Sequence, residues 1–472
     1  MNTRVEHDLL GEREVPADAY WGIHTLRASE NFALSDVTIA PELIRALAQV
    51  KKSCARANGE LGYLDTGGAE AIERACGEVA AGSLADQFIL DAYQGGAGTS
   101  TNMNVNEVIA NRALEILKYP RGRYDIIHPL EHVNLHQSTN DVYPTALKIA
   151  AIAGVRRLSE ATAHLQGRLQ QKEKAWADII TIGRTEMQDA IPLTLGAQFS
   201  AFADAVSRDR WRTFKCEERL RVVNIGGTAV GTGLTAPRRY IFLVIERLRQ
   251  ITGYGLTRGE NLVDQTANAD ALVEVSGILS ANASTLTKIA NDLRMLHYLG
   301  EIRLPPLQAG SSIMPGKINP VVCEAVVASA LRVHANHTVV ARATALGSFQ
   351  IVEQMPLVAQ ALLESLKLLF RGNTMLAECI ERIEPDPAVC RSHAYRSPML
   401  ITAFLPHIGY ERAQGLVHAY QGEGAGETFK DFLVRELGVE LVDRVLTSEN
   451  IMALGFRDIH RRQRGNNDTN RA

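Results

Sequence analysis

Apolar residues recur every seven positions in the segment between Pro237 and Pro305. Leu272, Leu279, Leu286 and Leu293 form one row, and Val275, Asn282, Ile289 and Leu296 form a second row between them. Two interleaved rows at this spacing are the a and d positions of a heptad repeat, interrupted by the polar Asn282. The pattern predicts a long helix that packs along a narrow seam against nearly parallel partners.

Four long stretches of the chain lack proline, which ends or kinks helices. They lie between Pro144 and Pro192, Pro192 and Pro237, Pro237 and Pro305, and Pro320 and Pro356. Another stripe at helical spacing is formed by Leu158, Leu165, Leu169 and Trp176. Several long helices with narrow seams predict a mainly α fold with a helical bundle.

The heptad seam is longer than one ordinary globular helix requires. The remaining faces of the same segment are rich in small residues, among them Ala281, Ala283 and Ala290. We interpret this as packing on more than one side and expect subunit association. A monomeric bundle with a wide apolar face is the alternative.

The composition is that of an ordinary globular protein, with 46% hydrophobic and 22% charged residues among 472. A net charge of −3 leaves no broad basic field, so we expect no nucleic-acid partner. The basic residues Arg457, Arg461, Arg462 and Arg464 are interpreted as a solvated end.

Because neither a signal segment nor a long apolar stretch is found, we expect a cytoplasmic protein with no membrane partner.

The cysteines are scattered and form no C-x-x-C pair. They are Cys54, Cys76, Cys216, Cys323, Cys379 and Cys390. No histidines lie near them at zinc spacing, so we expect reduced and mostly buried thiols.

Residues 310–320 read GSSIMPGKINP, which at first looks like a phosphate-binding loop. Five residues separate Gly310 from Gly316, one more than such a loop allows, and Ile318 stands where a hydroxyl is needed. The Gly-x-Gly pieces elsewhere lack a βαβ rhythm, which argues against dinucleotide binding. The glycine clusters are instead expected to be loops or helix starts where the backbone closely approaches another group.

Four segments are dense in small hydroxyl and amide side chains. They are GAGTSTNMN (96–104), HQSTND (136–141), GRTEMQD (183–189) and GSSIMPGKINP. Ser, Thr and Asn donors combined with a single lysine suit the binding of carboxylates, which fits a small dicarboxylic acid. For any one segment, turn or helix-cap chemistry is the alternative.

GSSIMPGKINP resembles the signature of the fumarase/aspartase superfamily. It is joined in the expected order by the other three segments and by GTAVGTGL and NDLRML, over a region from Asp8 to about residue 455. The resemblance implies a mainly α fold with domains at 1–137, 138–384 and 385–472. It also implies that the central long-helix bundle forms the core of a homotetramer whose active sites are shared by three chains. No metal and no organic cofactor are implied.

The resemblance also assigns roles to residues of this chain. Ser311 is the base, and it must be activated as an oxyanion by backbone amides and Lys317, because an ordinary serine hydroxyl is a poor base. Donors for the aci-carboxylate intermediate are Thr99, Ser138 and Thr139. The other carboxylate is held by Thr185, Lys317 and Asn319, and the amino group by Asn140. Ser312 is placed with the substrate-binding residues, and so is Arg27, for which a salt bridge is the alternative.

The N-terminal DLLGEREVPADAYWGIHTLRASENF (8–32) is similar to aspartate ammonia-lyases more than to fumarases. This implies the reversible conversion of L-aspartate to fumarate and ammonia. Fumarate hydratase, a lyase for a substituted aspartate, and a structural protein without the chemistry remain alternatives.

The chain departs from the family pattern in several places. Glu186 stands where relatives have His or Gln, and we expect it to help receive the ammonium group of the substrate, with an unrelated salt bridge as the alternative. The loop after NDLRML is about five residues shorter than in the family pattern, so we expect its geometry to differ from that of relatives. Val352 and Thr235 replace asparagines.

Overall fold

The computed structural model describes residues 2–423 and 426–456 of the chain. It divides into two compact units: unit 1 contains Met1–Ala161, Asp209–Ser284 and Ala328–Gly372, and unit 2 contains Thr162–Arg208, Thr285–Val327 and Asn373–Ala472. The four arginines expected to form a solvated end lie outside the described residues, as does the end of the expected third domain. The division into three domains stays a prediction.

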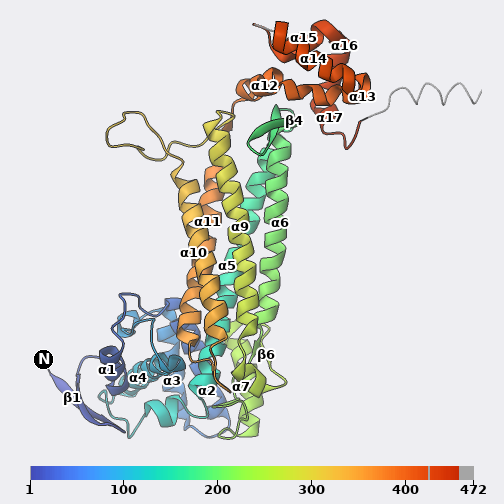
Figure 1. Cartoon of the computed structure of the whole chain (residues 1–472). Helices are drawn as coiled ribbons and strands as arrows, with labels where there is room; N and C mark the ends of the chain where they lie inside the picture. The colour runs from blue at the N-terminus through green and yellow to red at the C-terminus, as the bar shows by residue number, and fades with distance from the viewer. Residues whose placement is uncertain (1, 424–425, 457–472) are drawn as a thin grey trace, which may run out of the picture. The chain divides into compact units, whose positions relative to one another are not determined.

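The fold is mainly helical, which confirms the prediction from the sequence. Within the described residues, five helices have 24 or more residues: α5 (Thr139–Ala175), α6 (Leu195–Leu220), α9 (Asp270–Tyr298), α10 (Val321–Thr344) and α11 (Met355–Glu381). The first four largely occupy the stretches without proline. In each unit, segments of these helices lie side by side and form a bundle (Figure 1).

Both rows of the heptad repeat are buried along α9, as predicted. The polar member Asn282 is only 1% exposed, and its side-chain amide donates a hydrogen bond to Asp209 Oδ2 of α6 at 3.3 Å. The interruption of the seam is therefore a buried polar contact between two helices. A buried amide with a partner avoids the cost of an unsatisfied polar group.

The interpretation of the small residues was wrong at two positions. Ala283 and Ala290 are fully buried within this chain rather than lying on an outer face. Small side chains at these positions let neighbouring helices approach α9 closely. They therefore give no support to subunit association, which needs other observations.

Unit 1 contains the N-terminal hairpin and the shorter helices around it. The hairpin consists of β1 (Thr3–Asp8) and β2 (Gly11–Pro16), which pair antiparallel. The helical elements before α5 are α1 (Ile23–Asn31), α2 (Pro41–Glu60), α3 (Thr66–Ala81), η1 (Ala85–Gln87), η2 (Gly96–Gly98), α4 (Thr99–Ile116) and η3 (Pro129–Val133). The later elements of this unit are β5 (Val222–Val223), α7 (Arg238–Thr252), β6 (Thr257–Arg258) and α8 (Leu262–Ala267).

Unit 2 contains two short antiparallel sheets and the C-terminal helices. The sheets are formed by β3 (Ile180–Thr185) with β4 (Gln188–Thr194), and by β7 (Ile302–Arg303) with β8 (Glu384–Pro385). The helices are α12 (Pro387–Arg396), η4 (Pro398–Phe404), α13 (Leu405–Ile408), α14 (Tyr410–Glu423), α15 (Phe429–Leu437), α16 (Val439–Val445) and α17 (Ser448–Ile451). Phe404, Phe429 and Phe432 form the centre of an apolar core among them.

Two of the glycine clusters mark close approaches of the backbone, as expected. At Gly98, where φ is +91°, a Cβ atom would lie 2.4 Å from the buried ring of Tyr143. At Gly231, where φ is +85°, it would lie 2.4 Å from the carbonyl oxygen of Leu262. Both positions therefore require glycine for conformation and for space.

The free and buried state of the thiols follows the expectation from the sequence. All six cysteines fall in the described part of the chain, where they are free and buried. None of the helices described has the length and apolarity needed to cross a membrane.

Pro144 lies inside α5 instead of ending it. It lacks an N–H group, so the carbonyl oxygen of Asn140 loses its helical partner. The side-chain amide of Asn224 donates to that oxygen at 2.9 Å and also to Thr266 Oγ1 at 3.0 Å. Asn224, only 1% exposed, therefore compensates for the proline and joins the start of α5 to the loop at residues 224–233.

We predict that Asn224→Ala lowers the free energy of unfolding by about 1–3 kcal/mol, because the carbonyl of Asn140 and the hydroxyl of Thr266 lose the hydrogen bonds that they accept from Asn224. Pro144→Ala supplies the missing N–H group and should recover part of this loss in the double variant. Urea unfolding of the two single variants and the double variant measures the coupling. Additive effects would contradict the explanation.

Candidate active site

The residues assigned from the sequence fall into two groups. Unit 1 holds Arg27, Thr99, Ser138, Thr139 and Asn140, whereas unit 2 holds Thr185, Glu186, Ser311, Ser312, Lys317 and Asn319. The geometry within each group shows what its residues can do chemically.

The signature loop of unit 2 is closed by contacts between its two ends. The amide of Gly310 donates to the carbonyl oxygen of Lys317 at 2.8 Å, and the side-chain amide of Asn319 donates to the carbonyl oxygen of Gly310 at 2.9 Å. A Cβ atom at residue 310 would lie 2.8 Å from the same Lys317 oxygen. Glycine therefore permits the closure, and the Asn319 side chain helps to hold the loop closed.

Ser311 accepts two backbone hydrogen bonds inside this closed loop. Its Oγ accepts from the amides of Ile313 at 3.2 Å and Met314 at 2.9 Å. Amide donors aimed at one hydroxyl oxygen stabilise the form that has lost its proton. Ser312 and Lys317 of the same loop are exposed, so their side chains are accessible to a ligand.

Thr185 and Glu186 lie at the tip of the β3–β4 hairpin, and both are exposed. Thr185 pairs with Gln188, so Glu186 and Met187 form a two-residue turn. Their φ angles are +52° and +59°, the left-handed conformation that is normally left to Gly, Asn or Asp in such turns. Strained backbone of this kind is concentrated at functional sites.

In unit 1, Ser138 caps the start of α5. Its Oγ accepts from the amide of Asn140 at 3.2 Å, which leaves the hydroxyl proton free to donate. Asn140 donates through its side-chain amide to the carbonyl of Ala229 at 2.7 Å, which fixes the direction of its own oxygen.

Asp141 joins this segment to the glycine-rich loop. Its carboxylate accepts from the amides of Ser138 at 3.0 Å, Gly226 at 3.1 Å and Thr228 at 2.9 Å. Burial raises the pKa of Asp141 to about 6, although the three amides act in the opposite direction. The sequence analysis assigned it no role, because two of its three amide donors, Gly226 and Thr228, lie far from it along the chain.

Thr139 is connected to a buried polar network behind it. Its Oγ1 accepts from the side-chain amide of Asn102 at 3.1 Å, and Asn134 Oδ1 accepts from Asn102 at 3.2 Å and from Lys51 Nζ at 2.8 Å. Lys51 is completely buried, and this burial lowers its pKa to about 8. The Thr139 hydroxyl, like that of Ser138, accepts a bond from the protein and can donate its own proton.

The remaining two residues of unit 1 have simpler surroundings. Thr99 is the exposed first residue of α4, where the helix dipole favours an anion. The amides of Thr99 and Thr101 already donate to the Gly96 carbonyl and to Gln94 Oε1, so the Thr99 hydroxyl is the group offered to a ligand. Arg27 forms a two-bond salt bridge with Asp8, at 2.8 and 2.9 Å, and also donates to the carbonyl of Gly11. The salt bridge considered as an alternative for Arg27 is therefore present.

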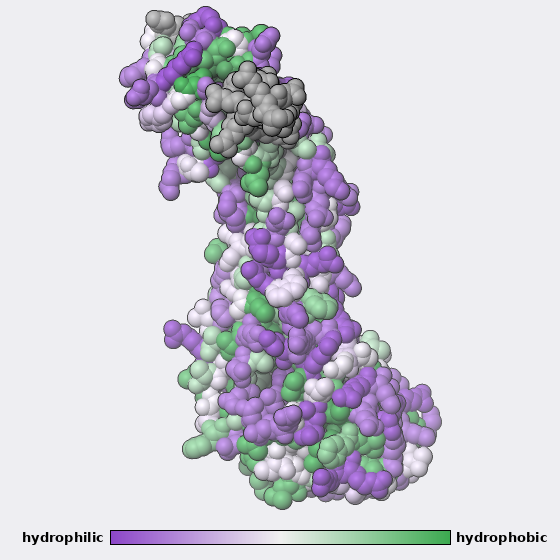
Figure 2. All heavy atoms as spheres, turned by 90° about the vertical axis from the view of Figure 1, so that its right-hand side faces the viewer, coloured by the Kyte–Doolittle hydropathy of each residue, from purple (hydrophilic) through white to green (hydrophobic). Residues whose placement is uncertain are grey.

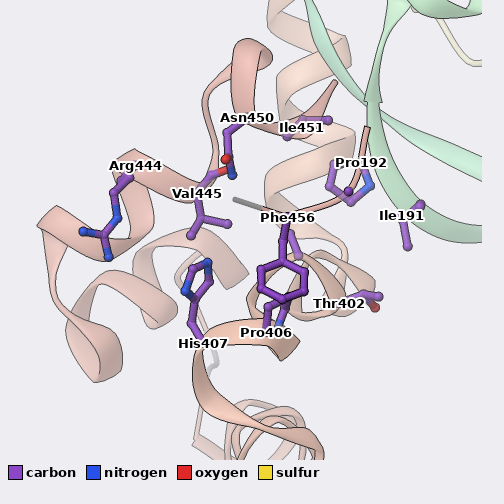
Figure 3. Close-up of a pocket in the computed structure, with 12 residues that line it drawn as sticks. Ile191, Pro192, Thr402, Pro406, His407, Arg444, Val445, Asn450, Ile451 and Phe456 are labelled. Atoms are coloured by element: carbon purple, nitrogen blue, oxygen red, sulfur yellow. The ribbon is translucent and has the colours of Figure 1, made fainter. Parts of the chain in front are cut away.

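The assigned residues were also compared with the surface pocket of unit 2 and with groups of side chains that could hold a metal ion. A pocket of about 270 Å³ in unit 2 is lined by Ile191, His407, Arg444, Asn450 and Phe456, among others, and by none of the assigned residues (Figure 3). In the described part of the chain, no three His, Cys, Asp or Glu side chains are grouped to hold a metal ion.

Comparison with known proteins connects this geometry to one family. A lyase family model matches residues 11–335. Aspartate ammonia-lyase from Bacillus sp is 42% identical over 443 residues, covering 92% of this chain and 94% of that protein. The enzyme of the same name from Escherichia coli strain K12 is 42% identical over 463 residues, with 96% of each chain covered.

Solved structures agree with the sequence comparisons. The fumarate lyase:delta crystallin from Brucella melitensis bound to cobalt has a TM-score of 0.90 and 45% identity, covering 94% of this chain and 98% of that chain. The class II fumarase from Schistosoma mansoni has a TM-score of 0.89 and 30% identity, covering 96% and 100%. The chain belongs to this lyase family, the fumarase/aspartase superfamily, which confirms the resemblance of its signature.

We predict that the charge of Lys51 gives stability a measurable pH dependence. Its folded pKa of about 8 lies below the ordinary 10.5, so between these pH values the unfolded chain binds more protons. The contribution of this group to stability therefore rises with pH in that window, by about 3 kcal/mol in total. In urea unfolding, wild type should gain stability relative to Lys51→Met from pH 8 to 10.5. If the free energies of unfolding of wild type and Lys51→Met changed in parallel between pH 8 and 10.5, the proposed effect of burial on the pKa of Lys51 would be contradicted.

Proposed function

We propose that this chain is a carbon–nitrogen lyase that converts L-aspartate reversibly to fumarate and ammonia. The relatives named aspartate ammonia-lyase support this at 42% identity over nearly the whole chain. The observation that carries the proposal is the Ser311 oxygen, which is held by two backbone amides in a loop that also presents Lys317. Localisation in the cytoplasm is part of the same proposal.

The difficult step of this reaction is the removal of a proton from C3 of L-aspartate. The C–H group at this carbon is a very weak acid. Ser311, as an oxyanion stabilised by the amides of Ile313 and Met314, takes this proton. The electron pair left on C3 moves into the neighbouring carboxylate to form an aci-carboxylate. It then returns to form the C2–C3 double bond while the C2–N bond breaks and ammonia leaves with the bonding electrons.

Donors in unit 1 suit the charge that develops on the aci-carboxylate. The hydroxyls of Ser138 and Thr139 each accept a hydrogen bond from the protein, so each has its proton available for a substrate oxygen. Thr99 adds a hydroxyl at the start of α4. Such preorganised donors stabilise charge without having to reorient during the reaction.

The remaining residues bind the second carboxylate and the ammonium group of the substrate. Lys317, Asn319 and Thr185 hold the second carboxylate, with Ser312 beside them. The side-chain amide of Asn140 is engaged by Ala229, which leaves the Asn140 oxygen to accept from the substrate's ammonium group. Arg27 contributes through its salt bridge, which fixes the N-terminal hairpin.

We further propose a homotetramer in which three chains supply each active site. The assigned residues fall in two units, and a shared site would bring such groups together from different chains. Exposed apolar side chains on the long helices support association: Trp211 and Phe214 of α6 are 65% and 66% exposed, and Leu331 of α10 is 62% exposed. Figure 2 shows hydrophobic residues interspersed with hydrophilic ones on one face.

The direct test is the ultraviolet absorbance of fumarate formed from L-aspartate by the purified protein. We expect Ser311→Ala to lower kcat by about 1,000-fold or more, because the base is lost. Ser284→Ala, an exposed serine on α9, should retain the wild-type rate. Fumarate from L-malate but not from L-aspartate would favour a fumarase, for which the 30% identical neighbour is the supporting observation. No product from either would contradict both functions.

Glu186→Gln tests the recognition of the ammonium group. We expect the KM for L-aspartate to rise roughly threefold, as for loss of an exposed ion pair, whereas kcat changes little. Glu186→Asp keeps the charge and should lie closer to wild type. Initial rates over a range of L-aspartate measure this, and an unchanged KM would remove Glu186 from the binding residues.

A further inference from the structure

Glu301 is a fully buried carboxylate for which the sequence analysis had no role. It follows α9 in the shortened loop, and it is 0% exposed. Oε1 forms a salt bridge with Arg184 at 2.6 Å and contacts His393 Nδ1 at 2.8 Å. Among the described residues, Oε2 is buried without a hydrogen-bond partner. A buried charge is costly unless it is paired, so these contacts need an explanation.

The backbone of Glu301 is fixed from both sides. At the end of α9, the amide of Glu301 donates to the carbonyl of Leu296 at 3.0 Å, and the amide of Gly300 donates to the carbonyl of His297 at 3.0 Å. The φ angle of Gly300 is +77°. This is the Schellman arrangement that ends many helices. On the other side, β7 pairs with β8, and the amide of Asp386 donates to the Glu301 carbonyl at 2.9 Å. The short loop therefore holds the Glu301 side chain in one position.

Arg184, the main partner of Glu301, directly precedes Thr185 in β3. It also lies opposite Asp189 across the hairpin, with its guanidinium 3.6 Å from the carboxylate. Thr185 and the left-handed turn at Glu186 and Met187 follow this anchored position. Left-handed φ angles suit a two-residue hairpin turn but are unfavourable for Glu and Met, so anchoring the adjacent Arg184 helps to hold the turn in this conformation.

We infer that Glu301 is a positioning residue: through Arg184 it fixes the hairpin tip that presents Thr185 and Glu186 to the substrate. His393 ties α12 to the same carboxylate, so the tip is also attached to the C-terminal helices of unit 2. This rests on the proposed function for the role of Thr185.

The test uses Glu301→Gln in the full-length protein, with the steady-state kinetics of fumarate formation from L-aspartate. Loss of the charge should raise KM by on the order of tenfold, with a smaller change in kcat, because a carboxylate-binding residue is misplaced. In a Thr185→Ala background, Glu301→Gln should raise KM by no more than about threefold, which is the share expected for Glu186. The matched control is Glu384→Gln, in the adjacent β8, whose exposed carboxylate binds Arg303 at 3.5 Å. Its KM should stay within about twofold of wild type.

A second measurement does not depend on activity. Amide hydrogen exchange of the peptide spanning 184–190 should be faster in Glu301→Gln than in wild type and unchanged in Glu384→Gln. If Glu301→Gln does not fold, Arg184→Lys provides the same comparison, because lysine keeps the charge but loses the planar fork.

The outcomes separate the two claims. Absence of fumarate from the wild-type protein would overturn the proposed function, whereas faster exchange at the turn would still support positioning by Glu301. An active wild type with unchanged KM and unchanged exchange in Glu301→Gln would overturn the inference. An equal rise in KM with and without Thr185 would also overturn it.

Discussion

Buried carboxylates that hold distant segments are the interaction on which the candidate site depends. Asp141 accepts three backbone amides from the start of α5 and from the glycine-rich loop. Glu107 of α4 accepts from the amides of Gly22, His24 and Thr25 and so fixes the start of α1. The two oxygens of each carboxylate can accept several hydrogen bonds. Backbone amides outside regular helices and strands can therefore be buried and still have a hydrogen-bond partner. Because Asp141 and Glu107 belong to the long helices α5 and α4, the segments that they bind are held in fixed positions.

The signature loop uses the same principle with a hydroxyl in place of a carboxylate. The contacts of Gly310 with Lys317 and Asn319 close the loop, and the closed loop directs two amides at the Ser311 oxygen. An exposed loop with an internally held serine combines access for substrate with a preorganised environment for a negative oxygen. Under the proposed function, this combination accounts for the mixture of glycine, serine and lysine in GSSIMPGKINP, whose spacing does not fit a phosphate-binding loop.

The sequence predicted the features that arise from regular spacing and from the signature, but not those that arise from long-range contacts. The heptad rows of α9, the mainly α fold and the family were predicted correctly. The outward placement of Ala283 and Ala290 was wrong, because small residues serve close helix packing inside one chain as well as between chains. The roles of Asp141 and Glu301 could not be predicted, since Gly226 and Thr228, which donate to Asp141, and Arg184 and His393, which bind Glu301, lie far away along the chain and follow no short motif.

The central claim is that this chain moves a proton at C3 of a four-carbon dicarboxylate and releases or adds ammonia at C2. The most direct measurement is a proton NMR spectrum of the product formed from fumarate and ammonium in D₂O. The account predicts L-aspartate with a single deuterium at C3, formed by wild type and absent with Ser311→Ala. L-malate as the product, or L-aspartate formed equally well without the Ser311 hydroxyl, would contradict it.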